Sequence, residues 1–216
     1  MIRGMMRPQK SLVAALTFWL SPPPMAIGNA QSLLALQSNP ILKVFVYPCP
    51  ELSYSVIQSA EREAARILRS ARIEFNWIEC STRMQSASCR STPAPTDLII
   101  RVLPRALQQA SPSALGIAGS PAGYATAFIF CDRILARRTH TQLLPVMFGR
   151  VLAHEITHLL LPNEDHADFG LMRGQWSTED LRITSPACQA LSSRWAQFMH
   201  REALRRLETA NSALQK

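Results

Sequence analysis

The chain has 216 residues and a mass of 24.1 kDa, a length that suits one domain with a sizeable core. Hydrophobic residues make up 47% of it and charged residues 18%, which excludes a disordered, collagen-like or coiled-coil chain. The net charge is +8. The basic residues are scattered and are not interleaved with aromatic ones, so we interpret them as a solvated surface and expect no nucleic-acid partner.

The N-terminal segment, residues 1–30, has the three-part order of a secretory signal peptide. Basic residues precede an apolar run at 11–20, prolines end the run, and small residues follow at Gly28 and Ala30. We therefore expect cleavage near Ala30-Gln31 and a secreted or periplasmic mature protein. The run is shorter than the about 20 apolar residues that span a bilayer, so we expect no stable membrane insertion after signal removal. We also expect the protein to be a monomer.

Five cysteines follow the expected cleavage site: Cys49, Cys80, Cys89, Cys131 and Cys188. In an oxidising compartment we expect one or two disulfides, and the odd number leaves at least one free thiol. Cys80 and Cys89 flank a short polar stretch, which favours that pair, whereas the other pairings stay open. No two cysteines have the CxxC spacing of a cysteine zinc site.

The mature chain predicts a single unit of the α/β type. Alternating apolar residues predict strands at 42–47 and 73–78, and the segments 97–103 and 123–130 are also predicted to be strands. Helical spacing of apolar residues predicts helices at 55–71, at 141–161 and from Pro186 to about Leu207. Residues 79–96 and the Pro- and Gly-containing stretch 104–122 are expected to be connections, and 162–176 a polar loop. Pro145 fits the second helix only in its first turn.

The second predicted helix carries the sequence His154-Glu155-Ile156-Thr157-His158. Histidines four residues apart lie one turn apart on one helix face, so both imidazoles can bind one ion. Zinc suits imidazole nitrogens, and a catalytic zinc site takes three protein ligands. Glu155 stands where a carboxylate can take a proton from the attacking water. The pattern therefore predicts a hydrolytic metal centre on this helix.

A third ligand is expected from the polar loop that follows the helix. His166 is the favoured candidate, because the chain turns after the helix and imidazole suits zinc. The alternatives that stay open are the carboxylates Glu164, Asp165, Asp168 and Glu179. Trp176, near the end of this loop, is expected to be a core or helix-packing aromatic.

The stretch from His154 to Trp176 resembles the metzincin group of zinc peptidases and, within it, short secreted bacterial proteins of metzincin-like type. The metzincin pattern is His-Glu-x-x-His-x-x-Gly-x-x-His, followed by a methionine turn. This chain has Leu161 at the glycine position, a third histidine two residues later than the pattern, and an early methionine, Met172. The resemblance implies that one Zn²⁺ ion is bound by the residues His154, His158 and His166. It also implies Glu155 as general base and Met172 as the candidate turn methionine.

The resemblance further implies a zincin-like fold of the α+β or α/β class over residues 31–216. Such a fold has a small, mixed, twisted sheet packed on a backing helix and an active-site helix, with a C-terminal helix. The implied activity is hydrolysis of a peptide or protein substrate by a secreted zinc peptidase. Strand 123–130 is either an edge strand that pairs with the substrate or an ordinary interior strand. The alternative function is a non-catalytic zinc-binding protein that uses the zincin scaffold as a binding or interaction module.

Overall fold

The computed structural model describes residues 39–81, 87–137, 141–161, 166–177, 179–180 and 190–215. These residues belong to one structural unit, Asn39–Lys216. Several predicted features lie outside the described residues: the signal segment 1–30, the carboxylates Glu164 and Asp165, Pro186 and Cys188.

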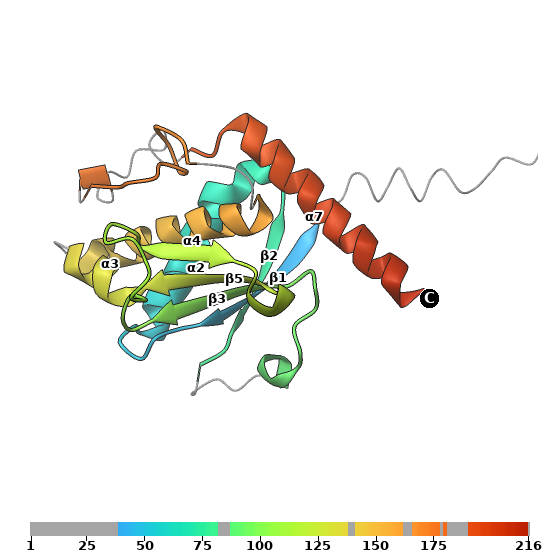
Figure 1. The fold of residues 1–216 in the computed structure, drawn as a ribbon, viewed down its shortest axis with the longest axis horizontal. Helices are drawn as coiled ribbons and strands as arrows, with labels where there is room; N and C mark the ends of the chain where they lie inside the picture. The colour runs from blue at the N-terminus through green and yellow to red at the C-terminus, as the bar shows by residue number, and fades with distance from the viewer. Residues whose placement is uncertain are drawn as a thin grey trace, which may run out of the picture. The chain divides into compact units, whose positions relative to one another are not determined.

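A mixed sheet of five strands, in the order β2-β1-β3-β5-β4, forms the centre of this unit (Figure 1). The strands are β1 (Ile41–Tyr47), β2 (Glu74–Glu79), β3 (Leu98–Leu103), β4 (Gly116–Gly119) and β5 (Ala125–Phe130). All neighbouring pairs are parallel except β4 and β5, which are antiparallel. The short strand β4 therefore forms one edge of the sheet.

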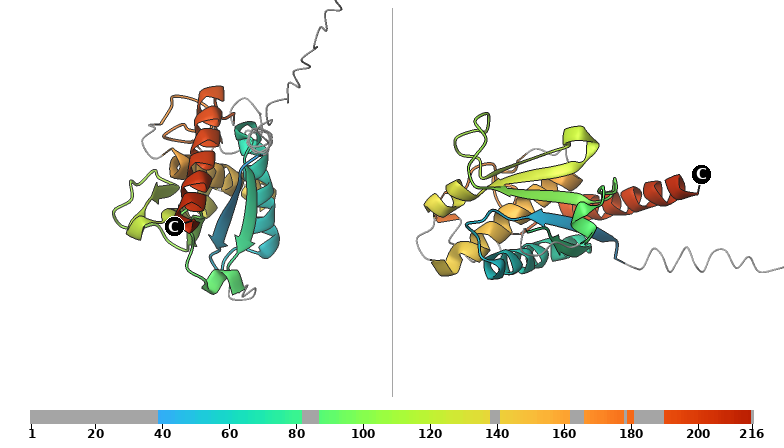
Figure 2. Two further views of the ribbon diagram at one scale, coloured as in Figure 1. Left: turned by 90° about the vertical axis from the view of Figure 1, so that its right-hand side faces the viewer. Right: turned by 90° about the horizontal axis from the view of Figure 1, so that it is seen from below.

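The helices are α2 (Tyr54–Leu68), α3 (Cys131–Arg137), α4 (Leu144–Leu160) and α7 (Ser193–Leu214). Leu42, Val44 and Val46 alternate along β1 into a core that they share with α2 and α4. Figure 2 shows α2 and α4 beside each other along the sheet, and α4 also contacts β4 and β5. Pro145 lies in the first turn of α4, as predicted, where its missing N–H costs no helical hydrogen bond.

The structure corrects three expectations along the chain. β4 lies inside the stretch 104–122, which was predicted to be a connection. β5 lies between β3 and β4, so the edge alternative for strand 123–130 is wrong and the interior alternative is confirmed. The last helix begins at Ser193, later than predicted, because the Ser192 hydroxyl caps it by accepting a hydrogen bond from the Trp195 N–H.

Helix α7 holds the C-terminal end of α4. The Arg206 guanidinium of α7 donates a hydrogen bond of 2.6 Å to the carbonyl of Leu159 in the last turn of α4. A cation at this end of a helix also interacts favourably with the helix dipole.

Within the described part of the chain, no helix combines the length and the apolar character needed to cross a membrane.

Gly149 allows α2 and α4 to approach closely. A Cβ atom at this position would lie 2.6 Å from Cβ of Glu63 and 2.8 Å from the carbonyl oxygen of Ala60, both on α2. We predict that Gly149→Ala lowers the free energy of unfolding by about 1–3 kcal/mol, because the helices must separate. Urea unfolding measures this change. Gly119→Ala is the control, since a Cβ there meets nothing within 4 Å, and equal midpoints for both variants would contradict the close approach.

The cysteines fall into two groups in the described residues. Cys80 and Cys89 form a disulfide, which confirms the favoured pair. Cys49 and Cys131 are free and buried.

Glu61 on α2 makes the stability of the fold dependent on pH. Burial, and then the charge of Glu79, raise the pKa of Glu61 from 4.5 to about 7. The folded state therefore binds the proton of Glu61 more tightly than the unfolded state does. The stability that this proton contributes to the fold is fully present below pH 4.5 and is lost as the pH rises through 7. We predict that Glu61→Gln raises the melting temperature more at pH 8 than at pH 5, relative to the unsubstituted protein. Glu208→Gln, at an exposed site on α7, is the control, and an equal effect of Glu61→Gln at both pH values would contradict the prediction.

Candidate metal centre

Three histidines converge at the C-terminal half of α4. His154 and His158 lie one turn apart on the helix, and His166 returns to them from the following segment. Nε2 of His158 lies 3.2 Å from Nε2 of His154 and 3.2 Å from Nε2 of His166. A tetrahedral zinc ion with Zn–N bonds of about 2.0–2.1 Å holds its ligand nitrogens roughly 3.3 Å apart. The donor type and the spacing of this cluster therefore fit zinc.

The orientation of His154 is fixed by a hydrogen bond to the backbone. Its Nδ1 lies 2.8 Å from the carbonyl oxygen of Leu171, which only accepts, so Nδ1 carries the proton. The lone pair of Nε2 then faces the other two histidines, as a metal ligand requires. Burial lowers the pKa of His154 to about 3 and that of His158 to about 4, so both rings are neutral at pH 7.

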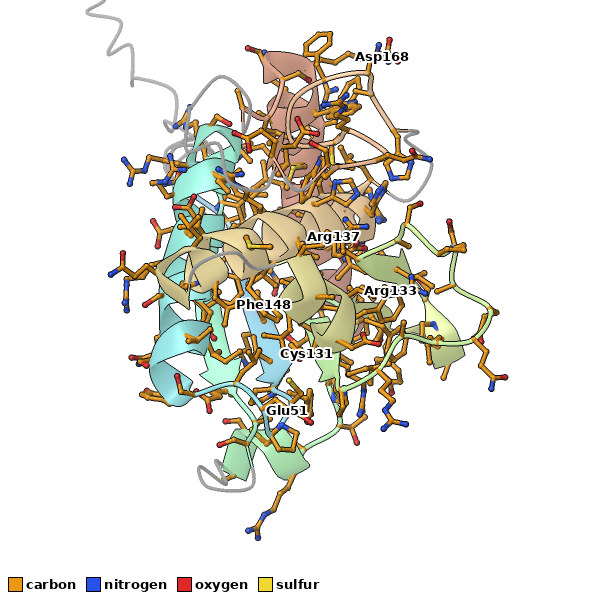
Figure 3. The ribbon with its side chains drawn as sticks, turned by 90° about the vertical axis from the view of Figure 1, so that its left-hand side faces the viewer. Glu51, Cys131, Arg133, Arg137, Phe148 and Asp168 are labelled. Carbon is orange, nitrogen blue, oxygen red and sulfur yellow. A yellow bond between two sulfur atoms is a disulfide. The ribbon has the colours of Figure 1, made fainter. Side chains whose placement is uncertain are left out.

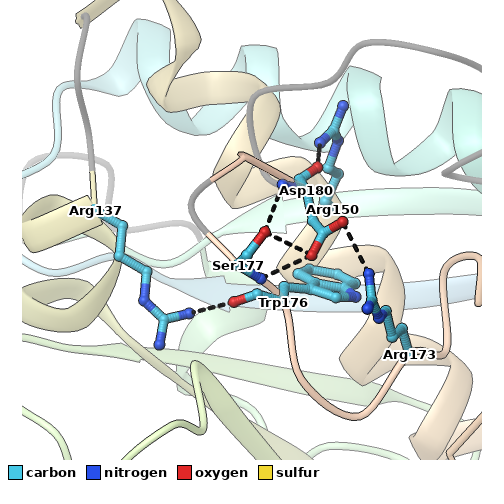
Figure 4. Close-up of polar contacts among 6 residues, drawn as sticks. All are labelled: Arg137, Arg150, Arg173, Trp176, Ser177 and Asp180. Atoms are coloured by element: carbon cyan, nitrogen blue, oxygen red, sulfur yellow. Dashed lines mark hydrogen bonds and ion pairs between the residues drawn. The ribbon is translucent and has the colours of Figure 1, made fainter. Parts of the chain in front are cut away.

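Trp176 lies against the metal centre, which the sequence did not predict. Its ring meets the His154 ring edge-on, with the centroids 5.2 Å apart. The Arg137 guanidinium of α3 donates to the Trp176 carbonyl at 3.2 Å and to the Ser113 carbonyl at 3.3 Å. Figure 4 shows the hydrogen bond from Arg137 to the Trp176 carbonyl. Through its two hydrogen bonds, this arginine joins the segments that carry Ser113 and Trp176.

Asp180 fastens the segment that carries Trp176 to α4. Its carboxylate accepts hydrogen bonds from the N–H of Ser177 at 2.8 Å and from Arg173 at 2.9 Å (Figure 4). The hydrogen bonds from Ser177, and then the charge of Arg173, lower the pKa of Asp180. Arg150, one turn before His154 on α4, donates to the Asp180 carbonyl at 2.6 Å. These contacts fix the position of Trp176 relative to the histidines.

Glu155 is buried next to the histidine cluster, with 4% of its surface exposed. Its carboxylate lies against β4, because a Cβ at Gly116 would be 2.6 Å from Oε1 of Glu155. Burial raises the pKa of Glu155 to about 8. A cation held by the adjacent histidines would favour the carboxylate form and oppose this effect.

The contact between Gly116 and Glu155 leads to a test. A Cβ at Gly116 would also lie 2.9 Å from the carbonyl oxygen of Phe128, so the carboxylate or the strand must move. We predict that Gly116→Ala lowers the metal-dependent hydrolysis expected of this site about 100-fold, since misplacing a catalytic group by about 1 Å has that effect. Gly119→Ala, on the same strand, should retain full activity. Activity of Gly116→Ala equal to that of Gly119→Ala would contradict the predicted placement of Glu155.

A cleft of about 620 Å³ opens onto these side chains. Its lining comes from α4, from His166, from β4, from the segment before β4 and from residues 173–176. β4 pairs only with β5, so its other edge is free of strand pairing within the described residues. The cleft therefore places a free strand edge beside Glu155 and the histidines.

The other candidates of the loop are placed as follows. Met172 is 1% exposed, and its carbonyl accepts a hydrogen bond from the Ala167 N–H at 2.7 Å, which closes the turn after His166. Its role as a turn methionine stays a prediction. Asp168 and Glu179 are exposed, and the cluster of potential ligands found in the described residues joins His166 to the α4 histidines without them.

The chain is similar in structure to known proteins, although no similarity in sequence is detected. No sequence model of a protein family matches the chain, and no curated protein is significantly similar to it. A zinc-dependent peptidase from Methanocorpusculum labreanum superposes with a TM-score of 0.54 at 12% identity, over 72% of this chain and 99% of that one. Archaemetzincin from Methanopyrus kandleri superposes with a TM-score of 0.53 at 15% identity, over 76% of this chain and 96% of that one. The predicted fold class is confirmed: the chain has a mixed α/β fold with a five-stranded mixed sheet, and it shares this fold with both solved structures.

Proposed function

We propose that the protein is a zinc-dependent peptidase with its active site in the cleft beside α4. The observation that carries the proposal is the convergence of His154, His158 and His166 next to the buried carboxylate of Glu155. The Nε2 atom of His158 lies 3.2 Å from that of each of the other two histidines. A site that only held a structural metal would need no carboxylate at this position. The fold shared with a zinc-dependent peptidase and with archaemetzincin supports the same conclusion.

The residues of the site have distinct roles in this proposal. His154, His158 and His166 would hold the ion through their Nε2 atoms. A zinc ion bound there would supply Lewis-acid chemistry, which polarises the scissile carbonyl and lowers the pKa of the attacking water. Glu155 accepts the proton of that water on its carboxylate and then delivers it to the departing amine. Trp176 and the Leu171 carbonyl keep His154 in its ligating orientation.

We further propose that an extended segment of the substrate lies along β4. The free edge of this strand lines the cleft, and main-chain hydrogen bonds to such an edge hold a peptide without regard to its side chains. Glu155 lies against Gly116 at the start of β4, so a peptide paired with this edge passes close to the general base. The substrate expected is an unfolded or extended polypeptide.

A peptide-cleavage assay tests the proposed function. The purified protein is loaded with zinc and incubated with a diverse peptide library, and new termini are identified by mass spectrometry. Cleavage that a chelator abolishes and added zinc restores is the expected result. Zinc bound at the histidine cluster with every peptide left intact would favour the alternative, a non-catalytic binding module.

We also propose that the mature protein is secreted or periplasmic and begins at Gln31. The charged, apolar and small-residue order of residues 1–30 supports export. The Cys80–Cys89 disulfide also suits an oxidising compartment. N-terminal sequencing of the protein from the extracytoplasmic fraction should give Gln31 as the first residue. An unprocessed N-terminus in the cytoplasmic fraction would contradict export.

A further inference from the structure

Two cysteines and a glutamate meet at the carboxyl edge of the sheet, apart from the histidine cluster. Cys49 follows β1 between two prolines, and Cys131 begins α3 directly after β5. β1, β3 and β5 run parallel, which brings both cysteines to the same edge. Each sulfur lies within 4.8 Å of the other and of a carboxylate oxygen of Glu51. Figure 3 shows Glu51 and Cys131 together, well separated from Asp168 in the loop of the histidine site.

Both sulfurs are free thiols in the hydrophobic core. Cys49 is 3% exposed and Cys131 is 1% exposed, whereas Glu51 lies at the surface. A hydrogen bond between the two sulfur atoms, followed by burial, raises the pKa of Cys49, and the same hydrogen bond lowers the pKa of Cys131. Buried thiols that only fill space need no carboxylate beside them. The third donor is therefore the feature that calls for an explanation.

We propose that Cys49, Glu51 and Cys131 bind a second cation, a thiophilic divalent metal of the zinc class. Thiolate ligands favour zinc-class metals, whereas magnesium and calcium take oxygen ligands. Zn–S bonds of about 2.3 Å in a tetrahedral site put two sulfurs roughly 3.8 Å apart, within the spacing found here. Binding displaces one proton from each thiol to solvent, so the two thiolates neutralise the two positive charges of the cation and the carboxylate adds one negative charge.

The consequence of this site is structural. A cation held there joins the turn after β1 to the first turn of α3. Helix α3 carries Arg133, which donates to the Ala114 carbonyl at 2.7 Å, and Arg137, which donates to the Trp176 carbonyl at 3.2 Å. Both carbonyls belong to residues that line the cleft. The second site therefore stabilises helix α3, which is hydrogen-bonded to two segments that line the candidate active site.

Cobalt substitution under exclusion of oxygen tests the proposal on the purified full-length protein. Thiolate ligands give Co²⁺ an intense charge-transfer absorption, which imidazole ligands do not. We expect this band in the unsubstituted protein and in His158→Ala, where the histidine site is disrupted. The band should vanish in Cys49→Ser and Cys131→Ser and persist in the matched control Cys188→Ser. The total amount of bound cobalt should fall by about one equivalent in Cys49→Ser and in Cys131→Ser.

Two further measurements do not depend on the folding of the buried cysteine variants. Glu51→Gln, at an exposed position, should weaken cobalt binding at the thiolate site about tenfold or more. Bound cobalt should also slow alkylation of Cys49 and Cys131 in the unsubstituted protein, as peptide mass spectrometry can measure. The proposal is overturned if the unsubstituted protein shows no thiolate band, or if the band depends on Cys188. A Cys49–Cys131 disulfide in protein purified without reductant would equally overturn it, in favour of a second cross-link.

Discussion

Glu155→Gln is expected to lower peptidase activity by about 10²–10⁴-fold while zinc stays bound. Glutamine keeps the size of the side chain beside Gly116 but cannot accept the proton of the attacking water, and positioned general bases contribute factors of this size. The measurement is kcat/KM on a peptide cleaved by the unsubstituted protein, together with the zinc content of both proteins. The loss should appear in kcat, because the proton moves in the transition state.

Two comparisons make the Glu155→Gln result specific. Glu208→Gln, at the exposed surface of α7, should keep full activity and reports the general effect of removing one carboxylate. Activity of Glu155→Gln within a factor of two of the unsubstituted protein would exclude Glu155 as the general base. Loss of zinc from Glu155→Gln would show instead that Glu155 is needed for zinc binding.

His158→Ala and His166→Ala are each expected to weaken zinc binding at the histidine cluster by more than about 100-fold. Removal of an outer-shell partner of a ligand alone costs 10–100-fold, and loss of a direct ligand costs more. Peptide hydrolysis should be lost in parallel at limiting zinc. Competition with a chromophoric chelator measures the affinity of each variant.

His200, which lies outside the histidine cluster, supplies the matched control. Nδ1 of His200 on α7 contacts the carbonyls of Ala71 and Arg72, so His200→Ala removes an imidazole elsewhere in the fold. It should leave zinc affinity and hydrolysis unchanged. If His166→Ala binds zinc as tightly as His200→Ala does, then His166 is no ligand and the third donor must be sought elsewhere in the loop.

Local sequence patterns predicted most of the helices and strands, because these elements follow from the spacing of residues that are close together in the sequence. The apolar segments predicted to be strands form β1, β2 and β3, and α2 buries the expected helical stripe. Residues His154 and His158 lie on one helix face, as their spacing requires. The loop between Cys80 and Cys89 is short, so the disulfide was also predictable.

The features that the sequence did not predict depend on contacts distant along the chain. β4 has glycine at two of its four positions, a composition typical of a turn, and exists as a strand through its pairing with β5. Trp176 lies at the metal centre because Arg137 and Asp180 fasten its segment to α3 and α4. The support of His154 by the Leu171 carbonyl likewise follows from the turn at Gly170, whose φ is 78°. No local periodicity encodes such contacts.

In the proposed active site, three imidazoles hold one catalytic zinc ion in the cleft. An anomalous difference map at the zinc absorption edge, from crystals of the protein grown with zinc, tests this arrangement. We expect a strong peak bonded to Nε2 of His154, His158 and His166 at about 2.0–2.1 Å. Zinc absent from these nitrogens, or held there with the ring of His166 turned away, would contradict it.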